Sequence, residues 1–133
     1  MGRSINIITV LFSIIVLFIV SKVNAQEEYG VKQKNKSIVI QVMGNCGMCK
    51  SRIEKASIKV KGVKYASWDI PSKELSLVID ERKCSPIDIK KAIAAVGHDT
   101  DLEIARDAVY NELPPCCKFR DPNSIKLDHG SGH

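Results

Sequence analysis

The sequence is poor in aromatic residues, and this scarcity limits what the protein can bind. Only seven of its 133 residues are Phe, Trp or Tyr, and its lysines are scattered rather than clustered around them. A nucleic-acid surface combines gathered cations with aromatic side chains, so we expect no nucleic-acid partner. The chain also lacks a Ser/His/Asp set, a pair of acids between apolar residues and a glycine-rich phosphate loop. Catalysis other than thiol chemistry therefore has no support in the sequence.

The N-terminus carries an apolar run without acidic residues. It extends from Ile5 to Val20, follows Arg3, and precedes Val23-Asn24-Ala25. Compact residues three and one positions before a cut are typical of a signal peptide, and the run is short for a bilayer span, which needs roughly 20 apolar residues. We expect residues 1–25 to be removed on export to the periplasm or the exterior, without stable membrane insertion afterwards. An uncleaved anchor is the alternative.

Hydropathy patterns divide the rest of the chain. Residues 26–36 are polar without a period and predict a linker. Alternating apolar residues predict strands at 37–43, 63–70 and 75–79, with a short fourth strand at Leu102 and Ile104. Apolar residues spaced by three or four predict two helices, the first from Met48 to Val60. The second begins at Pro86, with Ser85 as its N-cap and Asp88 in its first turn.

This order of elements predicts an α+β fold, the ferredoxin-like βαββαβ sandwich with two helices on one face of a four-stranded antiparallel sheet. Right-handed crossovers would place the Cys46 loop and the Gly97-His98 loop at the same end of that sheet, with Cys84 at the other. The domain would cover residues 37–105. Residues 106–133 would form a tail with a helical turn at 107–113 and an unstructured end from Asp121.

The sequence Cys46-Gly47-Met48-Cys49 places two thiols at the start of the first predicted helix. Two thiolates at this spacing can reach opposite sides of one soft ion, such as Cu(I) or Hg(II), but they are too few for structural zinc. The helix dipole favours the thiolate of Cys49. An exposed ion with two ligands is open to attack by a partner's thiolates, so we expect transfer by ligand exchange.

Four further residues are candidates for an auxiliary role at this site: His98, Met48, Cys116 and Cys117. His98 could supply a positive charge or a weak third ligand, or could only make a local hydrogen bond. Met48 could offer its thioether or pack over the loop. The total of five cysteines is odd, so at least one is unpaired within the chain. Either one of Cys116 and Cys117 closes a disulfide with Cys84, which we favour, or the pair completes a three- or four-thiolate site.

These features together resemble the heavy-metal-associated (HMA) domain family: a strand, a Cys-x-x-Cys loop, the helix that begins Lys50-Ser51-Arg52-Ile53, then Gly62-Val63 and a ββαβ remainder. The family includes copper chaperones, N-terminal domains of metal-pumping ATPases and a periplasmic mercury-binding protein. Residues 97–117 are similar to small exported bacterial members. The resemblance implies a monomeric carrier of Cu(I), or of Hg(II), that exchanges its ion with a metal-transporting ATPase or another dithiol protein.

The chain departs from the family pattern just before the first cysteine. Met43, Gly44 and Asn45 stand where the family usually has Gly, Met and one further residue. Members selective for zinc or cadmium often carry an acid at the position of Asn45, so its neutral side chain removes a hard ligand.

A thiol–disulfide oxidoreductase is the main alternative, because its Cys-x-x-Cys also lies at a helix start. Against it, only one strand precedes the cysteines, and a hairpin follows the first helix. No proline lies in a loop that could face the dithiol, since Pro71 is in the hairpin turn and Pro86 begins a helix. A structural module in which the two cysteines merely form a disulfide is the third interpretation.

Overall fold

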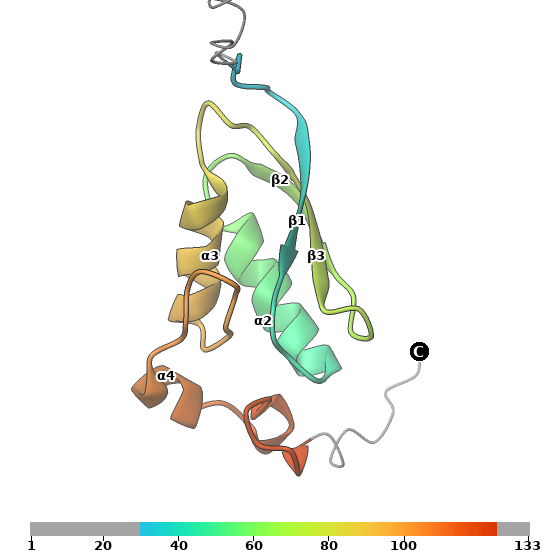
Figure 1. The fold of residues 1–133 in the computed structure, drawn as a ribbon, viewed down its shortest axis with the longest axis vertical. Coiled ribbons are helices and arrows are strands. Elements are labelled where there is room, and N and C mark those ends of the chain that lie inside the picture. The colour runs from blue at the N-terminus through green and yellow to red at the C-terminus, as the bar shows by residue number, and fades with distance from the viewer. Residues whose placement is uncertain (1–29, 125–133) are drawn as a thin grey trace, which may run out of the picture. The chain divides into compact units, whose positions relative to one another are not determined.

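The computed structural model describes residues 30–124, which are coloured in Figure 1. The predicted signal peptide 1–25, the first part of the linker and the chain beyond residue 124 lie outside the described residues. Within residues 30–124, no helix has both the length and the apolar character needed to cross a membrane.

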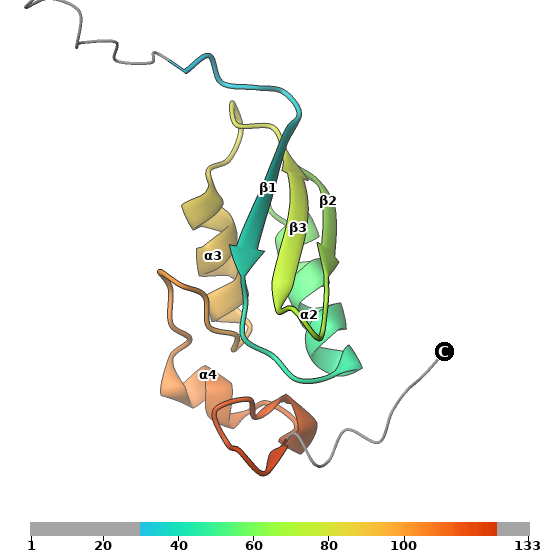
Figure 2. The ribbon, with the colours of Figure 1, turned by 45° about the vertical axis from the view of Figure 1, so that its right-hand side comes forward.

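Three antiparallel strands form the sheet: β1 (Lys36–Gln41), β2 (Val63–Trp68) and β3 (Glu74–Ile79). Their order is β1-β3-β2, so β3 lies between the other two (Figure 2). The residues of β3 alternate between a buried face and a more exposed one, which is the period of a half-buried strand. The hairpin predicted from the second and third apolar patterns is confirmed by the pairing of β2 with β3.

Helices α2 (Gly47–Ile58) and α3 (Pro86–Ala95) cover one face of this sheet (Figures 1 and 2). The predicted stripe of α2 is buried at Cys49, Ile53 and Ala56. At the start of α3, the Ser85 and Asp88 side chains form a capping box, and Pro86 is the first helical residue. Local sequence signals therefore place both helices correctly.

The predicted fourth strand is wrong. Thr100 pairs with Val42 in a single isolated bridge, whereas Leu102 and Ile104 are 68% and 65% exposed. The Thr100 N–H donates to the Glu103 carbonyl at 2.8 Å, and the Glu103 N–H donates to the Thr100 hydroxyl at 3.0 Å. These hydrogen bonds close a turn, and the turned backbone cannot continue a ladder. Among the described residues the sheet therefore has three strands rather than four.

After this turn the chain forms α4 (Asp107–Asn111) and a short 3-10 helix, η1 (Pro115–Cys117). The helical turn predicted at 107–113 is thus confirmed. Leu113 packs against Gly97, where a Cβ would lie 2.9 Å from the Leu113 side chain. Gly97 also has a φ of +98°, a backbone conformation that glycine adopts without strain. Both views place this segment at the end of the sheet where α2 begins. The end predicted to be unstructured instead forms a turn at 121–124, and the rest of it lies outside the described residues.

Candidate metal centre

The loop that carries the first cysteines rests on the loop around His98. The Met43 N–H donates to the Asp99 carbonyl at 2.8 Å, and His98 Nδ1 lies 2.9 Å from the Met43 carbonyl oxygen. Together with the bridge between Val42 and Thr100, these contacts confirm that the two loops meet at the same end of the sheet. The loop around His98 thus supports residues 43–49, which we call the cysteine loop.

Cys46 is the N-cap of α2, and Cys49 lies in the first helical turn. This placement brings their Sγ atoms to 3.3 Å, a contact between thiols and not a disulfide bond. The Asn45 N–H donates to the Cys49 sulfur at 3.4 Å. Trp68 fills the space beneath the loop, and a Cβ at Gly44 would lie 2.9 Å from its ring. Gly44 therefore permits the close approach of the loop to the core.

Both of these thiols are enclosed, since Cys46 is 2% exposed and Cys49 is fully buried. The expectation of an exposed pair with two ligands is therefore wrong. The C-terminal tail covers the Cys46 and Cys49 thiols. The sulfurs of Cys116 and Cys117 each lie 3.5 Å from the Cys46 sulfur and 3.9 Å from one another. Three thiols thus surround that of Cys46.

The favoured disulfide between Cys84 and the tail is also wrong. All five cysteines lie within the described residues, and all are free thiols. Cys84 is buried, with its sulfur 3.9 Å from the Asp80 carbonyl, while Cys116 and Cys117 contact Cys46. The physical reason is the course of the tail, which turns at α4 and packs on Gly97 before it reaches η1. This path leads to the cysteine loop.

The spacing of three of these sulfurs suits a metal ion. Cys46, Cys116 and Cys117 have their ligand atoms within 4.8 Å of one another. From the three separations of 3.5, 3.5 and 3.9 Å, the point equidistant from all three sulfurs lies roughly 2.1 Å from each, close to a metal–thiolate bond of about 2.3 Å. An ion slightly out of the plane of the three sulfurs would satisfy that bond length without moving the tail.

The four thiols differ in acidity. Burial opposes the thiolate of Cys46, but hydrogen bonds from the Cys49 N–H and from the neighbouring thiols outweigh it and lower the pKa of Cys46. Burial is the largest cause that raises the pKa of Cys49, Cys116 and Cys117. The N-cap position therefore favours the thiolate at Cys46 over Cys49, where we expected it, because Cys46 accepts more hydrogen bonds.

An arginine fastens the tail to the rest of the domain. The Arg120 guanidinium donates to Asp99 through Nε and Nη2, at 2.9 and 2.7 Å. It also donates to the Asp107 carboxylate at 2.9 Å and to the Ala105 carbonyl at 2.8 Å. We call this set of four residues the Arg120 clamp. Because Asp99 also accepts the Met43 N–H through its backbone, the clamp connects the tail directly to the cysteine loop.

His98 lies beneath this arrangement and is fully buried. Burial lowers the pKa of His98, although its hydrogen bond to Met43 opposes this, so the neutral imidazole is favoured over the cation. The Met43 carbonyl can only accept, which assigns the proton to Nδ1. Nε2 has no hydrogen-bond partner among the described residues. The ring stacks on Phe119, with centroids 5.6 Å apart, and thereby supports the tail from inside.

Two further contacts hold the tail in place. The Met48 thioether lies 3.6 Å from the Cys116 sulfur, so Met48 contacts the tail rather than the loop alone. The Asn45 amide donates to the Ser124 hydroxyl at 2.7 Å. Neither this contact nor the Arg120 clamp could be predicted from the sequence, because neither follows a local pattern.

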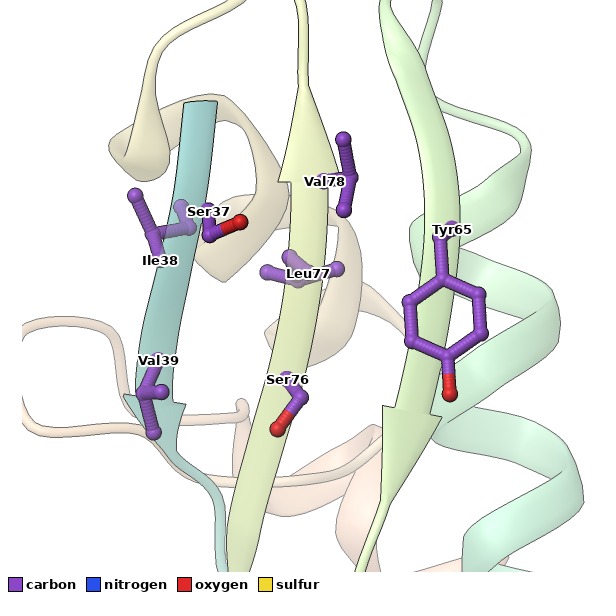
Figure 3. A pocket seen from close by; sticks show the side chains of 7 residues that line it. All are labelled: Ser37, Ile38, Val39, Tyr65, Ser76, Leu77 and Val78. Atoms are coloured by element: carbon purple, nitrogen blue, oxygen red, sulfur yellow. The ribbon is translucent and has the colours of Figure 1, made fainter. Parts of the chain in front are cut away.

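A hollow of about 330 Å³ lies elsewhere, on the outer face of the sheet (Figure 3). Its walls are the outward side chains of the three strands, among them Val39, Val78 and Tyr65. It contains no cysteine, histidine or carboxylate. This hollow is therefore separate from the group formed by Cys46, Cys49, Cys116 and Cys117, which we call the sulfur cluster.

No family model matches this chain, and no curated protein does. Several solved structures are similar to about half of it. The CopZ metallochaperone is 30% identical over 49% of this chain and 98% of its own, with a TM-score of 0.48. Oxidized MerP from Ralstonia metallidurans CH34 is 25% identical over 50% and 94%, with a TM-score of 0.48. A copper binding domain from HMA7, a P-type ATPase, is 29% identical over 49% and 89%, with a TM-score of 0.47.

Proposed function

We propose that this protein binds Cu(I) at the sulfur cluster and passes it to a partner dithiol protein. The observation that carries the proposal is the convergence of four thiols, each of the other three within 3.5 Å of the Cys46 sulfur. Thiolates are the ligands that select soft ions such as Cu(I). Within residues 30–124, Cys46, Cys116 and Cys117 are the one group of three ligand residues close enough to share an ion. This group contains no hard oxygen ligand.

The cysteine loop would hold the ion from below, through Cys46 and Cys49, and the tail would close over it. Cys116 is the least buried of the four thiols, so a partner's thiol reaches the ion on that side. Its sulfur bonds to the ion as the bond to Cys116 breaks, and its proton passes to the departing thiolate. No free ion is released, and no electron is transferred. A metal-transporting ATPase or another dithiol protein would be the acceptor.

Titration with Cu(I) against a competing chelator tests the proposal. The reduced full chain, kept free of oxygen, should bind Cu(I) tightly, and the double substitution Cys46→Ser and Cys49→Ser should abolish that binding. Cys84→Ser is the matched control, because Cys84 is also buried but lies outside the cluster, and it should bind as the unaltered chain does. Undiminished binding by the double variant would contradict the site.

Four thiols also make a tetrahedral set available, which two could not, so the metal itself must be tested. Competition of Cu(I) with Zn(II) and Hg(II) on the same sample measures the preference. We expect Cu(I) to displace Zn(II), following the order of affinities for sulfur ligands. Retention of Zn(II) under excess Cu(I) would assign a structural zinc site instead.

The compartment is part of the proposal. We infer export, with a cut after Ala25, from the apolar run and the residues that precede the cut. Expression of the full chain in a bacterial host, followed by N-terminal sequencing of the product, should give a chain that starts at Gln26. A product that keeps Met1 and sediments with membranes would assign an anchor.

Thiol–disulfide exchange is the alternative function, and one observation favours it. Cys46 has a lowered pKa, and the Cys49 sulfur lies 3.3 Å away, as in a nucleophile with its resolving partner. An insulin-reduction assay separates the two functions. A carrier should show no turnover above the uncatalysed rate, whereas an oxidoreductase should lose its turnover on Cys46→Ser.

A further inference from the structure

The sulfur cluster and the neighbouring Met48 thioether together offer more sulfur donors than one ion binds. Cys49 contacts Cys46 at 3.3 Å, Cys46 contacts Cys116 at 3.5 Å, and Cys116 contacts Met48 at 3.6 Å. With Cys117 beside Cys46 and Cys116, five sulfur atoms form one continuous group. A thiolate-bound ion of this class takes at most four such ligands. At least one donor is therefore left over when a single ion is bound.

The five donors fall into an inner and an outer set. Cys49 and Cys117 are fully buried, whereas Met48 is 50% exposed and Cys116 is partly exposed. The Cys46 sulfur is in contact with both sets. An ion between Cys46 and the inner thiols would leave the outer pair, Cys116 and Met48, free to bind.

The balance of charge favours the binding of two Cu(I) ions over the coordination of one Cu(I) by all four thiolates. Four thiolates around one Cu(I) would carry a net charge of minus three in a largely buried place, which is costly. A second Cu(I) lowers this to minus two. Met48 adds a soft ligand that brings no negative charge. Met48 is half-exposed and contacts the Cys116 thiol, so the two sulfurs can bind a second monovalent ion together.

We propose that Cys116, Met48 and Cys46 form a second Cu(I) site, in which the Cys46 sulfur bridges to the inner ion. The second site rests on the proposed function. When one ion is bound, Cys116 is among its ligands; when two are bound, the inner ion keeps Cys46, Cys49 and Cys117, and Cys116 passes to the outer ion. Each Cu(I) forms bonds to cysteine sulfurs as their S–H bonds break, and the released protons pass to the solvent. The Met48 thioether binds through a lone pair and releases no proton. Neither step involves a change of oxidation state. The outer ion is the one closest to solvent, and it is the first available to a partner.

Native mass spectrometry of the full chain, titrated with Cu(I) without oxygen, measures the stoichiometry. The unaltered chain should bind two Cu(I), and X-ray absorption of that form should contain a copper–copper scattering path. Cys116→Ser and, separately, Met48→Leu should reduce the count to one. Met48→Leu removes the thioether but keeps an apolar side chain of similar size, so it tests the site while all four thiols remain. Met43→Leu is the matched control, because Met43 is also a half-exposed methionine, at 47%, but precedes α2 and lies outside the proposed site; it should leave the count at two.

The outcomes separate the two proposals. A chain that saturates at one Cu(I) and still loses it on Cys46→Ser would overturn the second site and leave the proposed function intact. A chain that binds no Cu(I) would overturn both. A count of two that survives both Met48→Leu and Cys116→Ser would also overturn this assignment, because the second ion would then have other ligands.

Discussion

Removal of the Arg120 clamp should open the sulfur cluster without changing any sulfur. In Arg120→Gln, the paired hydrogen bonds to Asp99 are lost, together with the bond to the Ala105 carbonyl. The Arg120 and Asp99 side chains are only 28% and 13% exposed, so solvent screens this pair weakly. Asp107 is 89% exposed, and its ion pair should contribute little.

The expected loss follows from these contacts. Hydrogen bonds to charged groups contribute about 1.5–3 kcal/mol when they are well formed. Partial exposure and the remaining tail contacts reduce the sum, so we expect tail docking to weaken by about 2 kcal/mol. This corresponds to roughly a 30-fold larger population of the undocked tail. The tail thiols and Cys46 should then become accessible by the same factor.

Alkylation of the metal-free chain measures this accessibility. Cys117 is fully buried, so its rate of reaction with N-ethylmaleimide, followed by peptide mass spectrometry, reports undocking. The rate should rise roughly 30-fold in Arg120→Gln and less in Arg120→Lys, which keeps one ion pair. Arg106→Gln is the matched control, because Arg106 is exposed, precedes α4 and should leave the rate unchanged. Equal rates in Arg120→Gln and the unaltered chain would refute the role of the clamp.

Three further predictions concern the scaffold. Gly44→Ala should destabilise the fold by about 1–3 kcal/mol, because its Cβ would lie 2.9 Å from the Trp68 ring; an unchanged urea midpoint would contradict this packing. Ser85→Ala removes half of the capping box and should cost about 1 kcal/mol in unfolding free energy, while Cu(I) stoichiometry stays the same. Burial lowers the pKa of His98, so the unfolded chain binds that proton more readily, and the free energy of unfolding should fall as the pH drops below about 6.5. His98→Gln should flatten this dependence between pH 7 and 5, and an equal slope in both chains would show that another group titrates.

Local patterns were sufficient for most of the domain. The alternation in β1 and β3 and the stripe of α2 are properties of five to twelve consecutive residues, so the sequence reveals them directly. The start of α3 was predictable for the same reason, since Ser85, Pro86 and Asp88 lie within one turn. Trp68 is buried, as is typical of a lone large aromatic residue in an apolar strand pattern.

The missed features depend on contacts between distant residues. The apolar residues Leu102 and Ile104 fit a strand, but hydrogen bonds between Thr100 and Glu103 compete with the ladder and prevail. The direction of the tail depends on Arg120 and Asp99, which are 21 residues apart. No periodicity links such a pair, and chain length alone allowed the tail to reach either end of the sheet.

The tail turns the cysteine loop from an exposed pair of ligands into an enclosed site, and this has a consequence for transfer. Because Cys116 and Cys117 belong to the same chain, they meet the ion at an effective concentration in the millimolar range, above that of a partner protein in solution. A partner thiol that attacks the ion beside Cys116 therefore competes poorly with the Cys116 thiolate while the tail is docked. Under the proposed function, transfer would then depend on the fraction of molecules whose tail is released, and the Arg120 clamp would control that fraction from outside the set of sulfur ligands. A partner that supplies its own carboxylates to Arg120 would release the tail as it docks, and so would couple recognition to delivery.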